Sequence, residues 1–222
     1  IKYIYLIIIT NMENTRIEVI LGPMFSGKST ELIRRTSCYK AIGKNVLRIN
    51  HLNDIRTHNH IQTHSNIKKN AIKVSSLMSL LDKPEFVYCD VIGIDEAQFF
   101  DDLYEFIITI EPLGKIIIVS GLDGDFKRRP IGQILQIIPL CDEVIKLHAM
   151  DMYDKDGTPG IFTKRLTTSN KLIDIGAENK YKTVSRKNYF LKINNTDDQD
   201  DNNGKLDDSL TELQTTLTSS SY

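Results

Sequence analysis

Five strand candidates recur along the first two thirds of the chain, several of them nearly continuous apolar runs, and polar or helical segments separate them. They cover residues 17–21, 45–50, 87–95, 115–120 and 143–149. A strand that is covered on both faces is apolar throughout instead of alternating with polar residues, and such strands are typical of parallel sheets. The pattern therefore predicts an α/β fold with a parallel sheet and helices on both of its faces.

Three helices are predicted between these strands from the spacing of apolar residues and from the residues that end helices. The first covers 30–42 and ends at Gly43, and the later ones cover 76–81 and 101–110. Pro112 and Gly114 follow the third helix, and both residue types are common just after a helix end.

The rest of the chain differs in composition from this α/β core. Turn residues fill 155–160, and strand-like stretches follow near 171–175 and 181–185, which predicts a small β lasso or lid. The C-terminal stretch is rich in Asp, Asn, Ser and Thr and too poor in apolar residues to fold. We expect an N-terminal extension over residues 1–15 and a P-loop NTPase-like main domain over 16–149. The lasso should follow over 150–193 and a disordered acidic tail over 194–222.

A glycine-rich motif follows the first predicted strand and opens the first predicted helix. It fits the phosphate-binding pattern G-x-x-x-x-G-K-[ST], and its strand–loop–helix context disfavours a chance glycine turn. Backbone N–H groups and the helix N-terminus attract polyphosphate, Lys28 reaches the β- and γ-phosphates, and the Ser29 hydroxyl ligates Mg²⁺. The predicted site for ATP and Mg²⁺ consists of Gly22, Pro23, Met24, Phe25, Ser26, Gly27, Lys28, Ser29 and Thr30.

Two adjacent acids, Asp95 and Glu96, stand at the carboxyl end of the predicted strand 87–95. Ligands bind at the carboxyl ends of the strands in open α/β sheets, so these acids are candidates for chemistry. We expect Asp95 to hold Mg²⁺ directly or through water, and Glu96 to act as a general base toward the attacking oxygen. Gln98 is a further nucleotide-site candidate that could orient an acceptor. The competing interpretation is a pair of solvated acids after a strand.

Phe126 lies in the polar segment 121–130, which follows the next strand at the same predicted edge of the sheet. Its ring could stack on a flat ligand ring, and packing within the loop is an equally good interpretation. His58, His60 and His64 could be imagined as metal ligands, but a polar loop near the phosphate site is the preferred interpretation.

Charge and cysteine usage narrow the classes of partner. The range 194–222 holds seven acidic residues and one basic residue, which leaves 27 basic and 22 acidic residues elsewhere. The small excess of basic residues outside the tail suits small anionic ligands, but it is too weak to indicate nucleic-acid binding. The longest apolar run, residues 3–9, is far shorter than the roughly 20 residues that span a bilayer. The three cysteines have no metal-like spacing, so we expect buried, reduced thiols in a cytoplasmic protein. We expect no membrane partner.

The motifs together resemble those of the type II thymidine kinases. Residues 22–30, Gly-Pro-Met-Phe-Ser-Gly-Lys-Ser-Thr, are similar to that family's own version of the phosphate loop. Residues 95–99, Asp-Glu-Ala-Gln-Phe, are similar to its Asp-Glu-Gly/Ala-Gln-Phe segment. Residues 121–130, Gly-Leu-Asp-Gly-Asp-Phe-Lys-Arg-Arg-Pro, and the later segments 162–165 and 176–181 also fit, in the same order.

The resemblance, over about residues 16 to 192, implies transfer of the γ-phosphate of ATP to the 5′-hydroxyl of thymidine or deoxyuridine in nucleotide salvage and DNA precursor synthesis. It implies that Glu96 is the catalytic base, that Lys28 holds the donor phosphates, and that Arg56 and Arg165 lie near the transferred phosphate. It also implies a homotetramer with feedback by the thymidine nucleoside triphosphate. The nucleoside site that it implies consists of Asp54 at the sugar and Met24, Leu122, Phe126, Thr163, Leu172, Ile173, Asp174, Ile175, Gly176 and Tyr181 around the base.

The sequence departs from that family where four cysteines usually hold a structural zinc, at Asp151, Asp154, Ser185 and Asn188. Tetrahedral zinc prefers thiolates and imidazoles, so we expect no zinc in the lasso. The main alternative function is a P-loop ATPase that couples hydrolysis to nucleic-acid or protein binding. The lack of a basic stripe disfavours it, and the retained catalytic residues disfavour an inactive nucleotide-binding regulator.

Overall fold

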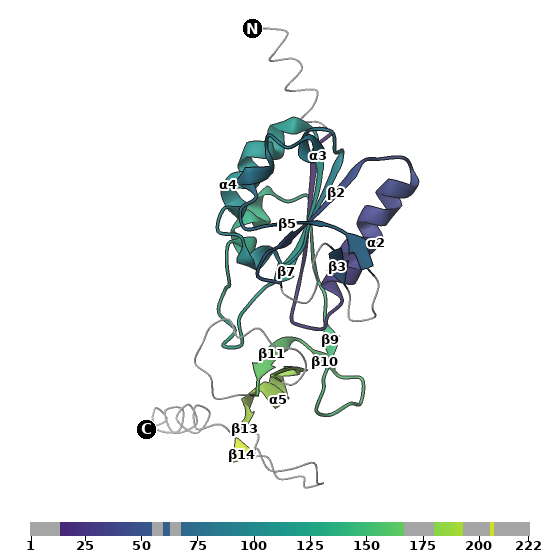
Figure 1. Ribbon diagram of the computed structural model, residues 1–222. Coiled ribbons are helices and arrows are strands. Elements are labelled where there is room, and N and C mark those ends of the chain that lie inside the picture. The colour runs from purple at the N-terminus through teal and green to yellow at the C-terminus, as the bar shows by residue number, and fades with distance from the viewer. Residues whose placement is uncertain (1–13, 55–59, 63–67, 167–179, 193–204, 207–222) are drawn as a thin grey trace.

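Figure 1 shows the computed structural model, which describes residues 14–54, 60–62, 68–166, 180–192 and 205–206. Its largest element is a six-stranded parallel sheet with the strand order β5-β2-β6-β7-β1-β8. The strands are β1 (Arg16–Gly22), β2 (Val46–His51), β5 (Ile72–Val74), β6 (Val91–Ile94), β7 (Ile116–Leu122) and β8 (Glu143–Lys146). The predicted parallel α/β sheet is therefore confirmed.

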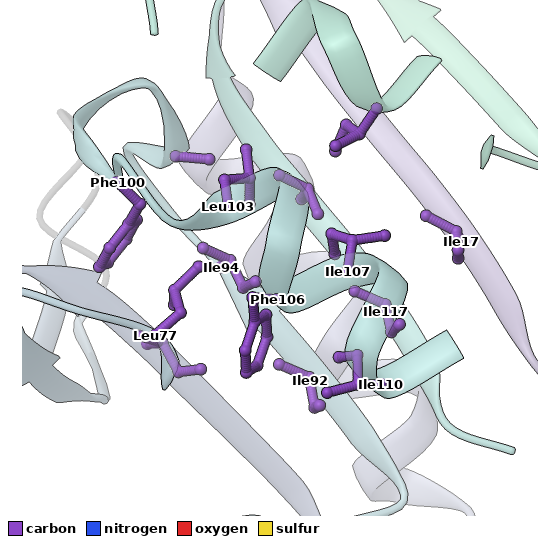
Figure 2. Close-up of a cluster of buried hydrophobic side chains, with 14 of the residues drawn as sticks. Ile17, Leu77, Ile92, Ile94, Phe100, Leu103, Phe106, Ile107, Ile110 and Ile117 are labelled. Atoms are coloured by element: carbon purple, nitrogen blue, oxygen red, sulfur yellow. The ribbon is translucent and has the colours of Figure 1, made fainter. Parts of the chain in front are cut away.

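Helices cover both faces of this sheet, as the apolar pattern predicts. Helix α2 (Lys28–Ala41) packs Leu32 and Ile33 on one face. Helix α4 (Leu103–Ile110) and the 3₁₀ helix η4 (Ile134–Leu140) cover the other face, and Figure 2 shows the cluster under α4. Successive residues of a strand point to opposite faces, so Ile117 belongs to the core under α4 and Ile118 to the core under α2.

The strand predictions differ from the structure mainly at the ends of strands. Three of them are confirmed within two residues, those at 17–21, 45–50 and 115–120. The prediction 87–95 is wrong at its start, because the short helix α3 (Pro84–Val87) precedes β6 and leaves Tyr88 exposed. The edge strand β5 is too short and too polar to be recognised, and only its pairing with β2 identifies it.

The last predicted strand, 143–149, is also too long. Strand β8 ends at Lys146, and the following β9 (Ala149–Met150) pairs with β10 (Pro159–Gly160) in a separate small sheet. Two of the predicted helices are confirmed, since α2 and α4 match 30–42 and 101–110 within two residues. Gly43 follows α2 with a φ of 83°, as a residue after a helix end often does.

The predicted helix 76–81 is only the 3₁₀ helix η1 (Met78–Leu80). The Asp102 carboxylate accepts the backbone N–H of Met78 at 3.0 Å and the Ser76 hydroxyl at 2.6 Å. These bonds attach the segment to the start of α4. The segment between β2 and β5, expected to be a polar loop, contains the antiparallel pair β3 (His60–Gln62) and β4 (Lys68–Asn70), and His58 and His64 lie outside the described residues.

A smaller C-terminal unit follows the sheet. It contains β9, β10, β11 (Phe162–Arg165), β12 (Tyr181–Val184), α5 (Arg186–Phe190) and β13 (Leu191–Lys192), which pairs with β14 (Lys205–Leu206). Figure 1 shows this unit beyond one end of the strands of the large sheet. The predicted strand at 181–185 is β12, but its partner is β11, and 171–175 lies outside the described residues. The short, cationic sequence of β11 does not show the apolar alternation by which strands are recognised.

The three cysteines are free thiols, and the expectation that all are buried is wrong. Cys89 is buried, whereas Cys38 is exposed on α2, outside its packed face. Within the part of the chain that the structure describes, no helix has the length and hydropathy needed to cross a bilayer. The expected N-terminal extension and the acidic tail fall almost wholly outside the described residues.

Candidate active site

The phosphate-binding motif connects β1 to α2, as its sequence predicts. Gly22 has a φ of 152°, and a Cβ atom there would lie 2.6 Å from the Leu147 carbonyl oxygen. Gly27 has a φ of 85° and directly precedes α2. Glycine is needed at both positions because its backbone adopts positive φ without steric cost. The loop therefore turns tightly and directs its N–H groups and the N-terminus of a 14-residue helix toward one point.

Two side chains fold back into this loop. The Ser26 hydroxyl donates to the Pro23 carbonyl at 2.9 Å, and the buried Lys28 ammonium donates to the same oxygen at 2.6 Å. The Lys28 charge therefore lies inside the curve of the loop, where anionic phosphate would be attracted. Ser29, in the first turn of α2, supplies the neighbouring hydroxyl.

Asp95 lies directly after β6 at the same edge of the sheet. Its side chain is buried, and its Oδ1 accepts the Ser120 hydroxyl of β7 at 2.6 Å. Strand β7 lies between β6 and β1, so the bond to Ser120 holds the Asp95 carboxylate toward the strand that is adjacent to the phosphate loop. Carboxylate and hydroxyl oxygens, such as those of Asp95 and Ser29, are the hard ligands that Mg²⁺ prefers. The two residues therefore fit a magnesium ion.

Glu96 has the left-handed backbone conformation, with a φ of 51°, at the sharp turn from β6 into the 3₁₀ helix η2 (Ala97–Phe99). The buried Gln98 amide donates to the Glu96 carboxylate at 2.7 Å, and its oxygen accepts the Leu122 backbone N–H at 3.0 Å. A Cβ atom on Gly121 would lie 2.6 Å from that Gln98 oxygen. Gln98 is thus held between β7 and Glu96, and its amide orients the carboxylate.

Asp54 lies just beyond β2, the next strand outward from β6. It is buried, and its Oδ2 accepts the side-chain amide of Asn50 at 2.8 Å. The Lys73 ammonium donates to the Asp54 carbonyl oxygen. The structure therefore places Asp54 at the same edge as Asp95, whereas Arg56 lies outside the described residues.

The C-terminal unit meets the phosphate loop through β11. The Thr163 hydroxyl accepts the Met24 backbone N–H at 3.0 Å. The Arg165 guanidinium donates to the Tyr181 hydroxyl at 2.6 Å and stacks 3.8 Å from the Phe126 ring centroid. Four of the expected nucleoside-binding residues, Met24, Phe126, Thr163 and Tyr181, are thus linked through β11, and positions 172–176 lie outside the described residues.

Ser120 and Asn50 are site residues that the sequence reasoning missed. Both are fully buried, and each holds an acid of the site through a side-chain hydrogen bond. A signal was available for Ser120, which is a lone polar residue at the carboxyl end of an otherwise apolar run, whereas Asn50 lies between the polar Arg48 and His51. A polar residue at that point of a buried strand needs a partner, and the partner lies at the ligand-binding edge.

A glycine-rich loop before a helix, a buried aspartate one strand away and a glutamate beside it define a P-loop phosphotransferase. The family model for thymidine kinase matches residues 15–189. Thymidine kinase of Sheeppox virus (strain KS-1) is 43% identical over 183 residues, covering 82% of this chain and 100% of that protein. Thymidine kinase of Monkeypox virus is 42% identical over 179 residues, covering 81% of this chain and 99% of that protein.

The chain belongs to the thymidine kinase family. Its function is that of an ATP-dependent phosphotransferase that acts on thymidine. Among solved structures, the flagellar accessory protein FlaH from Methanocaldococcus jannaschii is similar with a TM-score of 0.42 and 19% identity. That match covers 70% of this chain and 74% of FlaH.

Proposed function

We propose that the carboxyl edge of the sheet transfers the γ-phosphate of ATP to the 5′-hydroxyl of thymidine, or of deoxyuridine, with Glu96 as the general base. The supporting observation is the hydrogen bond from the Gln98 amide to the carboxylate of Glu96, the residue that follows the buried Asp95. It holds a carboxylate in a fixed orientation at the edge where the phosphate loop lies. A fixed base on the acceptor hydroxyl is what in-line phosphoryl transfer requires, because positioning supplies much of its rate.

On the donor side, the loop amides, Lys28 and the N-terminus of α2 bind the phosphates of ATP. Ser29 and Asp95 would hold Mg²⁺, which would neutralise negative charge on the phosphates. Thr30 and the remaining loop residues complete the cradle. Lys28 leaves the Pro23 carbonyl for the phosphate oxygens, which are stronger acceptors because they are charged.

On the acceptor side, Glu96 removes the proton of the 5′-hydroxyl as that oxygen attacks the γ-phosphorus. Asp54 binds the sugar, and Arg165, together with Arg56, stabilises charge on the transferred phosphoryl group. The contacts of Arg165 with Phe126 and Tyr181 hold its guanidinium beside the base pocket. Met24, Leu122 and Thr163 form the rest of that pocket.

The alternative, an ATPase that drives nucleic-acid or protein binding, would use Glu96 to activate water. The weak net charge of the chain does not favour it, because nucleic-acid binding depends on clustered basic residues. Thymidine-dependent ATP turnover that DNA does not stimulate would separate the two functions.

We further propose a homotetramer, which analytical ultracentrifugation tests, and a cytoplasmic location, which the three free thiols support.

The test of the catalytic assignment is Glu96→Gln, assayed with labelled ATP and a panel of deoxynucleosides. The amide keeps the size of the side chain but cannot accept the proton, so kcat for thymidine should fall by about 10²–10⁴-fold. Gln98→Leu removes the orienting bond to Glu96 and the acceptor of the Leu122 backbone N–H, but it keeps the base, so it should lower kcat by a smaller factor. The exposed Glu105→Gln on α4 is the control and should leave kcat unchanged. Undiminished phosphorylation by Glu96→Gln would refute the assignment of the base.

A further inference from the structure

Asp151 lies just after β9, is only 2% exposed, and is surrounded by N–H donors. Its Oδ1 accepts the backbone N–H of Tyr153 at 2.7 Å and of Asp154 at 3.2 Å. Its Oδ2 accepts the backbone N–H of Ser185 at 2.6 Å and the Asn188 side-chain amide at 2.9 Å. Two of these four donors, those of Ser185 and Asn188, join the start of the C-terminal unit to residues more than 30 positions later in the chain.

The neighbouring contacts belong to the same cluster. The Asp151 backbone N–H donates to Thr158 at 2.8 Å, and the Ser185 hydroxyl accepts the Asn188 backbone N–H at 3.3 Å at the start of α5. Burial raises the pKa of Asp151, but the hydrogen bonds from Ser185, Tyr153 and Asn188 outweigh it and lower the pKa to about 2. The carboxylate is therefore charged at neutral pH, and its bonds are charge-assisted.

These residues do not fit a structural zinc, although Asp151, Asp154, Ser185 and Asn188 occupy the four positions where the resembled family usually has cysteines. Hydroxyl and amide groups are not the thiolates or imidazoles that tetrahedral zinc prefers. The polarity is also opposite to that of a cation site, because the Ser185 N–H and the Asn188 amide point their positive ends at Asp151. The half-exposed Asp154 carboxylate lies 3.7 Å from the Lys187 ammonium instead.

We propose that Asp151 is a positioning residue: a metal-free anchor that holds the C-terminal unit against the active site through charge-assisted hydrogen bonds, at the positions where the resembled family usually has a structural zinc. Ser185 directly follows β12, so the anchor fixes one end of that strand. This inference rests on the proposed function, because it gives β11 and β12 their place in the nucleoside site.

The path from the anchor to the site is short. Strand β12 pairs with β11 in a register that sets Tyr181 opposite Arg165, and the neighbouring Thr163 contacts the phosphate loop. The Lys164 ammonium donates to the carbonyl oxygens of Asn188 and Tyr189, at 2.9 and 3.0 Å, and so ties β11 to α5. Loss of the anchor should therefore loosen the residues that hold the nucleoside and leave the ATP loop in place.

The first test is Asp151→Asn, which keeps the shape of the side chain but turns one acceptor into a donor that faces other donors. A buried mispaired group of this kind weakens the unit, so the KM for thymidine should rise about tenfold or more while the KM for ATP stays unchanged. Asp156→Asn, at an exposed aspartate of the same segment, is the matched control and should change neither constant. Unchanged KM for thymidine in Asp151→Asn, or an equal rise of both constants, would overturn the proposal.

A second test does not depend on activity. Hydrogen exchange at the amides of β12 and Ser185 should accelerate in Asp151→Asn, while the amides of β6 and β7 keep their wild-type rates. Unaltered exchange in β12 would refute the anchor. If wild-type protein shows no thymidine-dependent turnover while β12 loosens as expected, the proposed function fails and the anchor stands.

The third test introduces cysteines at the four positions where the resembled family usually has them. A variant with Asp151→Cys, Asp154→Cys, Ser185→Cys and Asn188→Cys should bind one zinc ion per chain by elemental analysis and restore a KM for thymidine close to the wild-type value. Wild-type protein purified in zinc-containing medium should carry none above background. Stoichiometric zinc in the wild-type protein would refute the proposal outright.

Discussion

The large sheet and the C-terminal unit meet at one site but are held together by different forces. In the sheet, apolar clusters on both faces bury the strands, and α2 and α4 pack on them. In the C-terminal unit, two-residue and four-residue strands are tied by charged groups: Asp151, Lys164 and Arg165. The phosphate loop is thus built on a packed core, whereas polar contacts hold the strands that β11 and β12 contribute to the proposed nucleoside site. Substitutions in the two regions should therefore have different effects.

The largest expected effect is loss of stability from the core under α4. Phe106 is fully buried there, with its ring centroid 5.9 Å from that of Phe86. Phe106→Ala removes most of a buried ring and leaves a cavity, so the free energy of unfolding should fall by about 3–5 kcal/mol. Urea denaturation measures this change. The exposed Tyr104→Ala on the same helix is the control and should change stability by less than about 1 kcal/mol.

A result that reversed these two magnitudes would break the comparison, because it would mean that burial does not stabilise the sheet. The same denaturation curves show whether the C-terminal unit unfolds with the sheet. A separate early transition that persists unchanged in Phe106→Ala would show that the polar contacts hold the unit independently.

An intermediate effect is expected where the sheet touches the C-terminal unit. The loop after β7 is shaped by the buried Asp125, which accepts the Arg129 backbone N–H at 2.8 Å. The neighbouring Arg128 guanidinium lies over three rings of the C-terminal unit, with centroid distances of 4.3, 4.7 and 5.4 Å to Tyr189, Phe190 and Phe162. A cation over an aromatic face contributes about 0.5–2 kcal/mol.

Arg128→Ala should therefore raise the KM for thymidine by about three- to tenfold, since part of the contact that holds the nucleoside pocket is lost. The free energy of unfolding of the sheet should change by less than about 0.5 kcal/mol. Arg34→Ala, which removes an exposed arginine from α2, is the control for the lost charge and should leave the KM for thymidine unchanged. A KM for ATP that rose as much as that for thymidine would contradict a role confined to the acceptor side.

The same division explains what the sequence could predict. The buried strands and the phosphate loop are local patterns, so β1, β7, Lys28 and Asp95 can be recognised from neighbouring residues alone. Ser120 could be found only as a lone polar residue in an apolar run, because its bond to Asp95 depends on the adjacency of β6 and β7. Asn50 bonds to Asp54 four residues later, but it lies among other polar residues that hide it. In the C-terminal unit, pairing joins residues that lie far apart in sequence, and local patterns do not reveal such contacts.

The role of Asp151 is the clearest case. From the sequence it is one acid in a turn-rich segment, and only its departure from the cysteine pattern marks it. The backbone N–H groups of Tyr153 and Asp154 bond to it as in a local Asx turn. Ser185 and Asn188 lie beyond 167–179, and no spacing rule predicts their bonds. Gln98 is intermediate, since the sequence places it near the site but does not reveal that it binds the Glu96 carboxylate.

The smallest expected effect tests how much charge contributes to the sheet region. On α2, Glu31 pairs with Arg34 at 2.6 Å and with Arg35 at 2.8 Å. These bonds, of which the one from Arg34 has the larger effect, lower the pKa of Glu31 to about 2. Because the folded pKa lies below the unfolded value near 4.5, the pair stabilises the fold above pH 4.5 and the effect is lost as pH falls toward 2. Arg34 is largely exposed, so solvent screening reduces the contribution to about 1 kcal/mol.

Glu31→Gln should therefore lower the free energy of unfolding by about 1 kcal/mol at pH 6 and by progressively less as the pH is lowered through 4 to 3. Urea denaturation of both proteins across this range measures the difference. Arg34→Gln should produce a smaller loss in the same pH window, because Arg35 remains bound to Glu31. A difference between Glu31→Gln and the wild type that did not shrink in acid would show that Glu31 acts through packing, and that the sheet does not depend on this charge at all.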